Sequence, residues 1–279
     1  MMNRLIYDPK TQRVSLTNLS TLEIADKQQE LESVHEFILR IDERQDRTFK
    51  LNLIDNITLG KQMLEDNVYR GAVLEGIPVT YAQTCEIINN IPIKSGLKPS
   101  QINEIVSLKR AWEYILTKDV LLSNDFMKIS LNLVTIIHTI IGANMESLTP
   151  DQVGRLREVP IYVGGVKNHD FGIPDQDQLK EELDLLNKID DPVIKALETF
   201  LYLCKKQMFR DGNKRSASLV ANFLLIKDSV GLISIKEELI PDFKILLIDW
   251  YENNNKRDIM NFLLNKCYIY NYIGKSFLG

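Results

Sequence analysis

Leucine, isoleucine and valine recur at spacings of three and four residues through most of the chain, and this periodicity predicts amphipathic helices. Thr80 precedes one such run and Asp211-Gly212 precedes another, as helix-capping residues do. The predicted helices span residues 20–43, 50–70, 80–90, 100–117, 124–142, 177–187, 192–207, 213–228, 236–253 and 256–269. The pattern therefore indicates a mostly helical protein.

Two stretches depart from the helical pattern. Residues 3–15 suit either a short strand pair around Asp8-Pro9 or an extended arm. Residues 157–173 are richer in β-forming residues and have Gly164-Gly165 at their middle. We expect this second stretch to form a small β-hairpin that projects from a helical body.

A chain of 279 residues is long enough for one large domain or two small ones. The least periodic junction is residues 91–100. It predicts a division into an N-terminal helical region, residues 1–98, and a larger core, residues 99–279.

The composition is that of an ordinary soluble globular protein, with 44% hydrophobic and 26% charged residues. A net charge of −4 gives no general attraction to nucleic acid or to anionic lipid. The three cysteines are far apart and contain no C-x-x-C pair, which favours free thiols in a reducing compartment. With no long apolar run and no signal-peptide pattern, the expected location is the cytoplasm, and a membrane span is not expected. Heavy use of Ile, Asn and Lys fits an AT-rich bacterial genome.

Residues 209–215, Phe-Arg-Asp-Gly-Asn-Lys-Arg, lead directly into a strongly helical run. The first turn of a helix carries unpaired N–H groups and the positive end of the helix dipole. Gly212 lets the backbone approach a ligand, and Lys214 and Arg215 add positive charge, so the segment predicts a phosphate site. The carboxylate of Asp211 is suited to bind a magnesium ion at that site. The alternative is a capped surface helix, but basic residues favour the other end of a helix.

Three segments resemble features of the Fic family in the expected order. Residues 207–215 resemble the motif His-x-Phe-x-Asp/Glu-Gly-Asn-Gly/Lys-Arg at Phe209 and from Asp211 onward. Leu74-Glu75-Gly76 resembles the inhibitory Glu-Gly element of many Fic proteins. Residues 154–165, Gly-Arg-Leu-Arg-Glu-Val-Pro-Ile-Tyr-Val-Gly-Gly, resemble the flap, a β-hairpin that holds the target backbone by strand addition.

The resemblance covers residues 50–250 and implies the Fic/Doc (Fido) fold, a helical core with a flap and an N-terminal helical extension. Fic proteins typically transfer AMP from ATP to a Ser, Thr or Tyr hydroxyl of a target protein, so ATP and Mg²⁺ are the implied cofactors. The resemblance assigns the metal to Asp211 and regulation to Glu75. It assigns phosphate binding to Gly212, Asn213, Lys214 and Arg215, and target binding to Ile161, Tyr162 and Val163.

Gln207 occupies the position of the motif histidine, which takes the proton from the target hydroxyl. A neutral amide cannot accept a proton near pH 7, and losing a general base typically costs about 10²–10⁴ in rate. Efficient AMP transfer by the usual route is therefore not expected. Three histidines exist elsewhere. His35 and His138 lie on predicted helices and favour structural roles, whereas His169 is either a solvated loop residue or a base that faces the cleft.

Two further positions depart from the family pattern. Ser218 stands where many AMP-transferring Fic proteins have an arginine that binds the terminal phosphate and pairs with the inhibitory glutamate. Gly71 replaces the Ser or Thr of the inhibitory element. Glu75 can therefore pair with Arg215 or Lys214, or serve as a structural residue. The Asn-Lys-Arg ending is also similar to that of Doc, the branch that transfers phosphate, although Doc too keeps the histidine.

Three functions remain open from the sequence. The first is a nucleotidyl- or phosphoryl-transferase that uses ATP and Mg²⁺ on a protein hydroxyl. The second is a catalytically inactive nucleotide-binding or protein-interaction module, for example in a toxin–antitoxin or phage-defence system. The third is an engineered His-to-Gln variant of an active parent. Met208, where proline is common, departs as well as Ser218, and this favours natural divergence.

Overall fold

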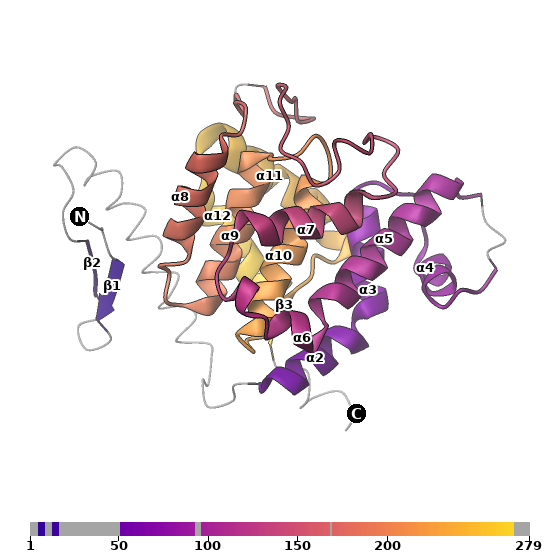
Figure 1. Cartoon of the computed structure of the whole chain (residues 1–279), viewed down its shortest axis with the longest axis horizontal. Helices are drawn as coiled ribbons and strands as arrows, with labels where there is room; N and C mark the ends of the chain where they lie inside the picture. Colours follow the sequence, from indigo (N-terminus) through magenta and orange to yellow (C-terminus); the bar gives the residue numbers. More distant parts are fainter. Residues whose placement is uncertain (1–4, 9–12, 17–50, 93–95, 168, 271–279) are drawn as a thin grey trace.

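The computed structural model describes residues 5–8, 13–16, 51–92, 96–167 and 169–270. The mostly helical fold is confirmed (Figure 1). The predicted helix 20–43, with His35, lies outside the described residues. The longer helices are α2 (Leu53–Gln62), α3 (Leu64–Leu74), α4 (Tyr81–Ile88), α5 (Pro99–Ile115), α7 (Leu131–Gly142), α8 (Gln176–Leu186), α9 (Pro192–Lys206), α10 (Asn213–Lys227), α11 (Ile240–Asn253) and α12 (Lys256–Phe262). Shorter elements are α6 (Lys118–Leu121), the 3₁₀ turns η1 (Asn124–Phe126) and η2 (Glu237–Leu239), and the π-turn η3 (Leu263–Cys267).

Capping side chains set several helix starts. Thr80 and Gln83 form a capping box at α4, in which the Thr80 hydroxyl accepts the Gln83 N–H at 3.2 Å. Ser130 caps α7 by accepting the N–H of Leu133 at 3.2 Å. The predicted helix 124–142 therefore begins later than expected, after the short turn η1.

The predicted helix 50–70 is divided into α2 and α3 at Met63. This residue ends α2 with ψ of 11° and begins α3 directly afterwards. The bend lets α2 pack on α10 while α3 packs on α5 and α4, which one straight helix could not do. Packing of both apolar faces thus overrides the continuous periodicity.

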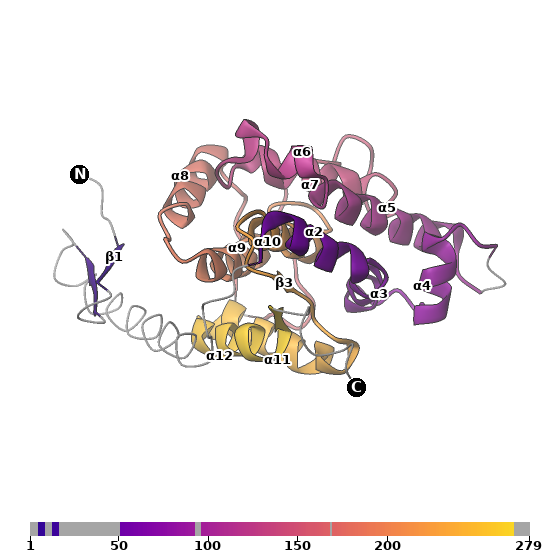
Figure 2. The ribbon, with the colours of Figure 1, turned by 90° about the horizontal axis from the view of Figure 1, so that it is seen from below.

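Helix α10 lies at the centre of the molecule. It packs against α9, α7, α5 and α2, and the two orthogonal views show these helices surrounding it (Figures 1 and 2). Figure 2 also shows α11 and α12 as a separate layer on the side opposite α5–α7. Twelve of the fifteen residues of α10 are buried. Because packing along its whole length holds this buried helix, the position of its N-terminus is fixed relative to the surrounding helices.

Two short antiparallel sheets complete the described fold. β1 (Leu5–Asp8) pairs with β2 (Arg13–Leu16), so of the two alternatives for residues 3–15 the structure has the strand pair. β3 (Leu232–Ile233) pairs with β4 (Tyr268–Ile269), which ends the predicted helix 256–269 early. No helix among the described residues is long and apolar enough to cross a membrane.

The core runs without a break from α2 to α12, across the junction near residue 98. Buried apolar residues of α3 and α5 belong to the same cluster as those of α9 and α10. The division into regions 1–98 and 99–279 stays a prediction.

Candidate functional site

The predicted phosphate-binding turn connects α9 to α10. α9 ends at Gln207, whose φ of 46° is left-handed, and α10 begins after Gly212, whose φ is 77°. The side chain of Asn213 closes the turn, because its Oδ1 accepts the N–H of Phe209 at 2.9 Å and its Nδ2 donates to the Phe209 carbonyl at 2.8 Å. Asn213 therefore shapes the turn in this structure, and its amide is fully engaged.

His138 on α7 packs against the turn and is hydrogen-bonded to it. Its ring stacks on Phe209 with centroids 3.7 Å apart. Its Nδ1 accepts the N–H of Gly154 at 2.9 Å, so the neutral ring carries its proton on Nε2, which lies 3.0 Å from the Asp211 carbonyl. Burial lowers the pKa of His138 to about 4. The ring is thus neutral and fully bonded, which agrees with the predicted structural role.

Gly212 has a left-handed conformation and lies close against α7. A Cβ there would stand 3.4 Å from His138 Nε2, from Ile141 Cδ1 and from Met145 Sδ. Its left-handed φ is also one that other residues adopt at a cost. The residue therefore lets the turn lie directly on α7.

The N-terminus of α10 lacks a side-chain cap. Helices α2, α4, α7, α8 and α9 are capped through hydrogen bonds to the side chains of Asn52, Thr80, Ser130, Asp175 and Asp191, whereas α3, α5, α11 and α12 lack such a bond, as α10 does. At α10 the residue in the capping position is Gly212, which has no side chain to accept a bond. The first backbone N–H groups of this helix are thereby left for an anion.

Lys214 and Arg215 each face a carboxylate, from α3 and α5 respectively. Lys214 Nζ lies 3.5 Å from Oε2 of Glu75, the residue that ends α3. Arg215 Nη1 lies 2.7 Å from Glu104 Oε2 on α5, and Nη2 lies 3.5 Å from Asp211 Oδ1. Burial opposes the charge of Arg215, but Glu75, Asp211 and Glu104 together raise its pKa.

Of the two pairings that the sequence left open for Glu75, the structure has the one with Lys214. The other oxygen of Glu75, Oε1, is buried without a hydrogen-bond partner. Glu104 was not predicted, because nothing in the periodic pattern around it distinguishes it from a solvated helix residue. Arg215 is 5% exposed, so its side chain is a buried ion-pair residue in this structure, whereas Lys214 is 29% exposed.

Gln207 faces the protein interior. Its side-chain Nε2 donates to the carbonyl of Cys204 at 2.6 Å, and the residue is 5% exposed. The hydroxyl of Tyr251 donates to the same carbonyl at 3.0 Å. The amide therefore fastens the last turn of α9.

Asp211 is the candidate metal ligand. Its side chain is 39% exposed, and its Oδ2 accepts the hydroxyl of Ser147 at 2.5 Å. Within the described ranges, no three His, Cys, Asp or Glu side chains gather in a way that could hold a metal. A single exposed carboxylate still fits Mg²⁺, which is commonly held by one or two carboxylates together with substrate phosphates.

The predicted flap forms a turn, but its described residues form no strand pair. The Val166 N–H donates to the Val163 carbonyl at 3.1 Å, which closes the turn around Gly164-Gly165. The prediction of a β-hairpin is therefore wrong about the strands, because the described residues of this segment form a turn without strand pairing. Its two legs, on either side of the turn, are tied instead through Arg157.

The buried guanidinium of Arg157 replaces the backbone ladder. It donates to the carbonyls of Val159 at 2.7 Å, of Phe171 at 3.1 Å and of Gly172, so both legs are bound to one side chain. Its Nε also donates to the Gln207 carbonyl at 2.6 Å. Carbonyls engaged in this way are not available for strand pairing. Arg157 was not predicted as a site residue, although it lies in the segment that resembles the flap.

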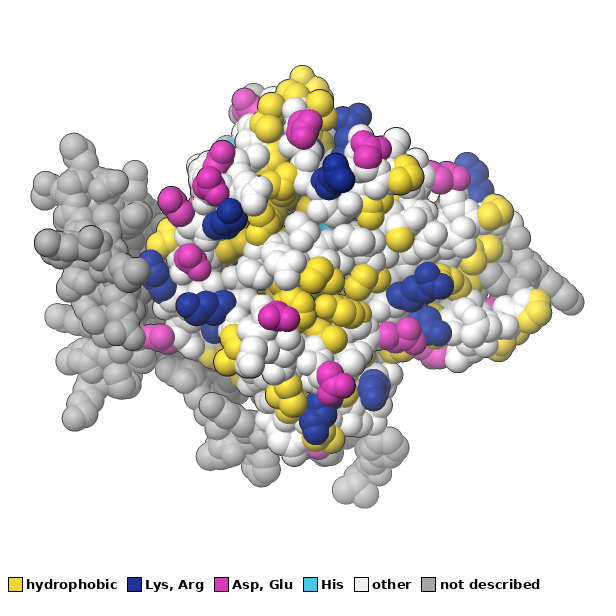
Figure 3. Space-filling view, in the orientation of Figure 1, with side chains coloured by type: hydrophobic (Ala, Val, Ile, Leu, Met, Phe, Trp, Pro, Cys, Tyr) yellow, Lys and Arg dark blue, Asp and Glu magenta, His cyan; other side chains and the backbone are white. Residues whose placement is uncertain are grey.

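The flap surface is apolar. Tyr162 is 96% exposed and Ile161 is half-buried, while Val163 packs against the core. Hydrophobic side chains project at the top of the space-filling view, over the loop between α7 and α8 (Figure 3). His169 belongs to this loop, its ring is edge-on to Phe171 with centroids 4.7 Å apart, and burial lowers its pKa.

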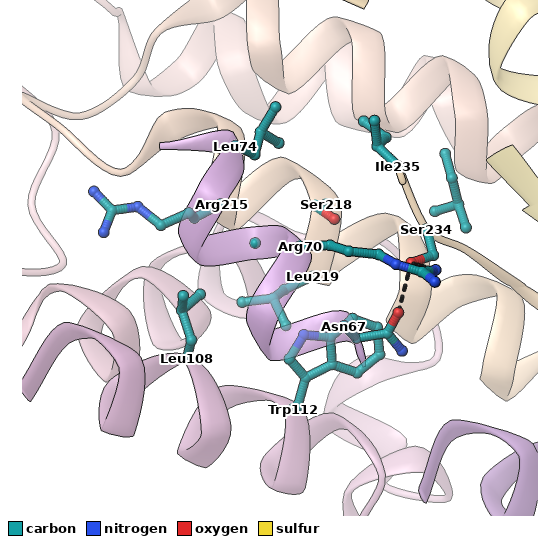
Figure 4. A pocket seen from close by; sticks show the side chains of 12 residues that line it. Asn67, Arg70, Leu74, Leu108, Trp112, Arg215, Ser218, Leu219, Ser234 and Ile235 are labelled. Carbon is teal, nitrogen blue, oxygen red and sulfur yellow. Dashed lines mark hydrogen bonds between the residues drawn. The ribbon is translucent and has the colours of Figure 1, made fainter. Parts of the chain in front are cut away.

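Ser218 and Gly71 line one cavity of about 30 Å³ between α3 and α10 (Figure 4). Arg70 crosses this space, and its guanidinium donates to Ser234 at 2.9 Å, away from Arg215. The two positions that depart from the family pattern thus face the same space. Both carry small residues, and this explains why the cavity is open.

Residues 128–225 match the sequence model of the Fic/DOC family. The chain is 25% identical over 251 residues to Protein adenylyltransferase fic-1 of Caenorhabditis elegans, across 86% of this chain and 46% of that protein. It is 25% identical over 231 residues to Protein adenylyltransferase Fic of Culex quinquefasciatus, across 80% of this chain and 44% of that protein. The chain spans about half the length of the curated relatives it matches.

Solved structures share the fold. Fic-1 (residues 134–508) of Caenorhabditis elegans superposes with a TM-score of 0.61 at 19% identity, across 87% of this chain and 69% of that one. A Fic domain containing signaling protein from Bacteroides thetaiotaomicron superposes with a TM-score of 0.62 at 17% identity, across 83% and 90%. The sequence matches thus support a Fic/DOC-type domain at residues 128–225, and the solved structures show that the chain shares the Fic fold.

Proposed function

We propose that this chain binds a nucleotide polyphosphate, together with Mg²⁺, at the N-terminus of α10. The observation that carries the proposal is the uncapped first turn of a buried helix, with Lys214 beside it. A helix N-terminus with free N–H groups and an adjacent cation is a ready anion site. ATP is the expected nucleotide, because the relatives are named protein adenylyltransferases.

Within this site, Lys214 and the backbone N–H of Asn213 would hold phosphate oxygens, and Gly212 would let them approach, while its own N–H is donated to Asp211 Oδ1. Asp211 would hold Mg²⁺, which would neutralise charge on the phosphates. Arg215 would act mainly by keeping Asp211 and the first turn of α10 in place, because its guanidinium is buried between Glu104 and Asp211.

We infer that the chain does not transfer AMP efficiently by the histidine route. Gln207 is neutral, and its amide is bonded to the Cys204 carbonyl. His138 is not a substitute, because both of its ring nitrogens are occupied. The chain would then act through nucleotide binding or protein association. Protein AMP transfer at a reduced rate is the second candidate, favoured by the complete Asp211–Arg215 segment and by the relatives' names.

Two further roles follow from the same proposal. Glu75 would regulate the site, because its carboxylate competes with a phosphate for Lys214. Ile161, Tyr162 and Val163 would bind an apolar segment of a partner protein, because the loop that carries them exposes hydrophobic side chains. A peptide laid along the loop would pair with backbone groups that Arg157 does not bind.

Calorimetry with ATP and Mg²⁺ tests the binding proposal. We expect binding by the unaltered chain and a clear loss in Lys214→Ala. The matched control is Lys180→Ala on α8, where the lysine is exposed and paired with Asp177 at 3.0 Å. Absence of binding at millimolar nucleotide would refute the proposal.

Labelled ATP and a cell lysate test the chemistry. We expect no target labelling by the unaltered chain and labelling by Gln207→His. Labelling by the unaltered chain at the level of that variant would show that Gln207 does not limit transfer, and the second candidate would then replace the first.

A further inference from the structure

Ser147 is hydrogen-bonded to Asp211, the candidate metal ligand, through the carboxylate oxygen Oδ2. The exposed Ser147 hydroxyl donates to Asp211 Oδ2 at 2.5 Å. The other oxygen, Oδ1, accepts the N–H of Gly212 at 2.5 Å and lies 3.5 Å from Arg215 Nη2. Oδ2 is therefore the oxygen left for a cation, and a cation that reaches it also meets Ser147.

The loop that carries Ser147 is anchored on both sides. Met145 is 4% exposed and its N–H donates to the Gly142 carbonyl at 3.1 Å. Leu148 is 9% exposed and its N–H donates to the Met145 carbonyl at 3.2 Å. Two buried side chains thus fix a short loop whose exposed hydroxyl is aimed at the carboxylate.

We propose that Ser147 and Asp211 together form the protein's part of the Mg²⁺ site, with Ser147 Oγ as a ligand. This inference rests on the proposed function. A hydroxyl that donates its hydrogen to a carboxylate keeps its oxygen lone pairs, and Mg²⁺ takes oxygen ligands of this kind. P-loop enzymes hold Mg²⁺ beside a triphosphate with a Ser or Thr hydroxyl and an aspartate.

The spacing of the two oxygens agrees with this role. Mg²⁺ is octahedral with bonds of about 2.0–2.1 Å, so neighbouring ligands stand ~3 Å apart. Ser147 Oγ and Asp211 Oδ2 are 2.5 Å apart and need only a small opening to reach that spacing. Phosphate oxygens and water would fill the other positions, since the described part of the chain has no group of three or more His, Cys, Asp or Glu side chains that could hold a metal.

The test measures how much Mg²⁺ strengthens ATP binding. Calorimetry gives the dissociation constant of ATP with Mg²⁺ and with EDTA, for the unaltered chain and for Ser147→Ala, Ser147→Thr and Thr58→Ala. The last variant is the matched control, because the exposed Thr58 hydroxyl bonds within its own helix, to the Ile54 carbonyl at 2.8 Å. Titration of Mn²⁺ in the presence of ATP, followed by its electron paramagnetic resonance signal, reads the metal directly.

We expect Ser147→Ala to lose about tenfold or more of the Mg²⁺-dependent gain in affinity, with ATP binding in EDTA unchanged. Ser147→Thr should keep the gain, and Thr58→Ala should match the unaltered chain. A full gain in Ser147→Ala would overturn the inference, as would metal-independent ATP binding by the unaltered chain. If the unaltered chain bound no ATP with or without metal, the proposed function itself would fall, and this inference with it.

Discussion

Replacing Arg157 with methionine removes the side chain that ties the flap to the phosphate-binding turn. The guanidinium donates to the carbonyls of Val159, Phe171, Gly172 and Gln207. A hydrogen bond from a charged donor contributes roughly 1.5–3 kcal/mol net, and an acceptor left buried and unsatisfied costs about 1–3 kcal/mol. The losses are not additive, because the carbonyls reach water once the flap loosens. We therefore expect a total loss of about 3–4 kcal/mol in the free energy of unfolding.

Urea denaturation followed by circular dichroism measures this loss. The matched control is Arg155→Met, two residues away and exposed, which should cost no more than about 0.5 kcal/mol. Arg157→Lys should fall between the two, because one ammonium group cannot reach carbonyls on both legs and at Gln207. Hydrogen exchange should rise in residues 158–172 while α10 stays protected. If Arg157→Met cost no more than Arg155→Met, the assignment of Arg157 as the link between flap and turn would be refuted.

Three more outcomes are expected. Glu75→Gln should tighten Mg²⁺–ATP binding about tenfold, ~1.4 kcal/mol, because it frees Lys214, and unchanged affinity in calorimetry would contradict this. Gly71→Ala should stabilise the fold by up to ~1 kcal/mol in thermal unfolding, because the residue is helical and the added Cβ would stand 3.7 Å from Leu108 Cδ1; a loss of stability would show that the contact is too tight. His138 has its pKa lowered from 6.5 to about 4 by burial, so the unfolded chain takes up its proton first as the pH falls. Stability should be full above pH 6.5 and decline toward pH 4, by up to ~1.4 kcal/mol per unit, and His138→Gln should lose that slope.

The sequence by itself predicted most of the described helices, the turn before α10 and the departure at Gln207. These features are local, because caps, periodicity and a left-handed glycine depend on neighbouring residues. Helix α10 begins where Asp211-Gly212 predicted, and α4 begins after Thr80. The buried, structural state of His138 also followed from the apolar run around it.

Only the tertiary structure decided which charges meet. Glu104 and Arg215 are 111 residues apart in the chain, and Ser147 and Asp211 are 64 apart. Whether such residues touch depends on which helix faces pack together, and periodicity within one segment carries no record of that. The same reason explains the division of one predicted helix at Met63, where packing on two different partners overrode a continuous apolar stripe. In the flap, the Arg157 side chain binds backbone carbonyls that a β-hairpin would use for strand pairing. The pattern of β-forming residues does not indicate this side-chain contact.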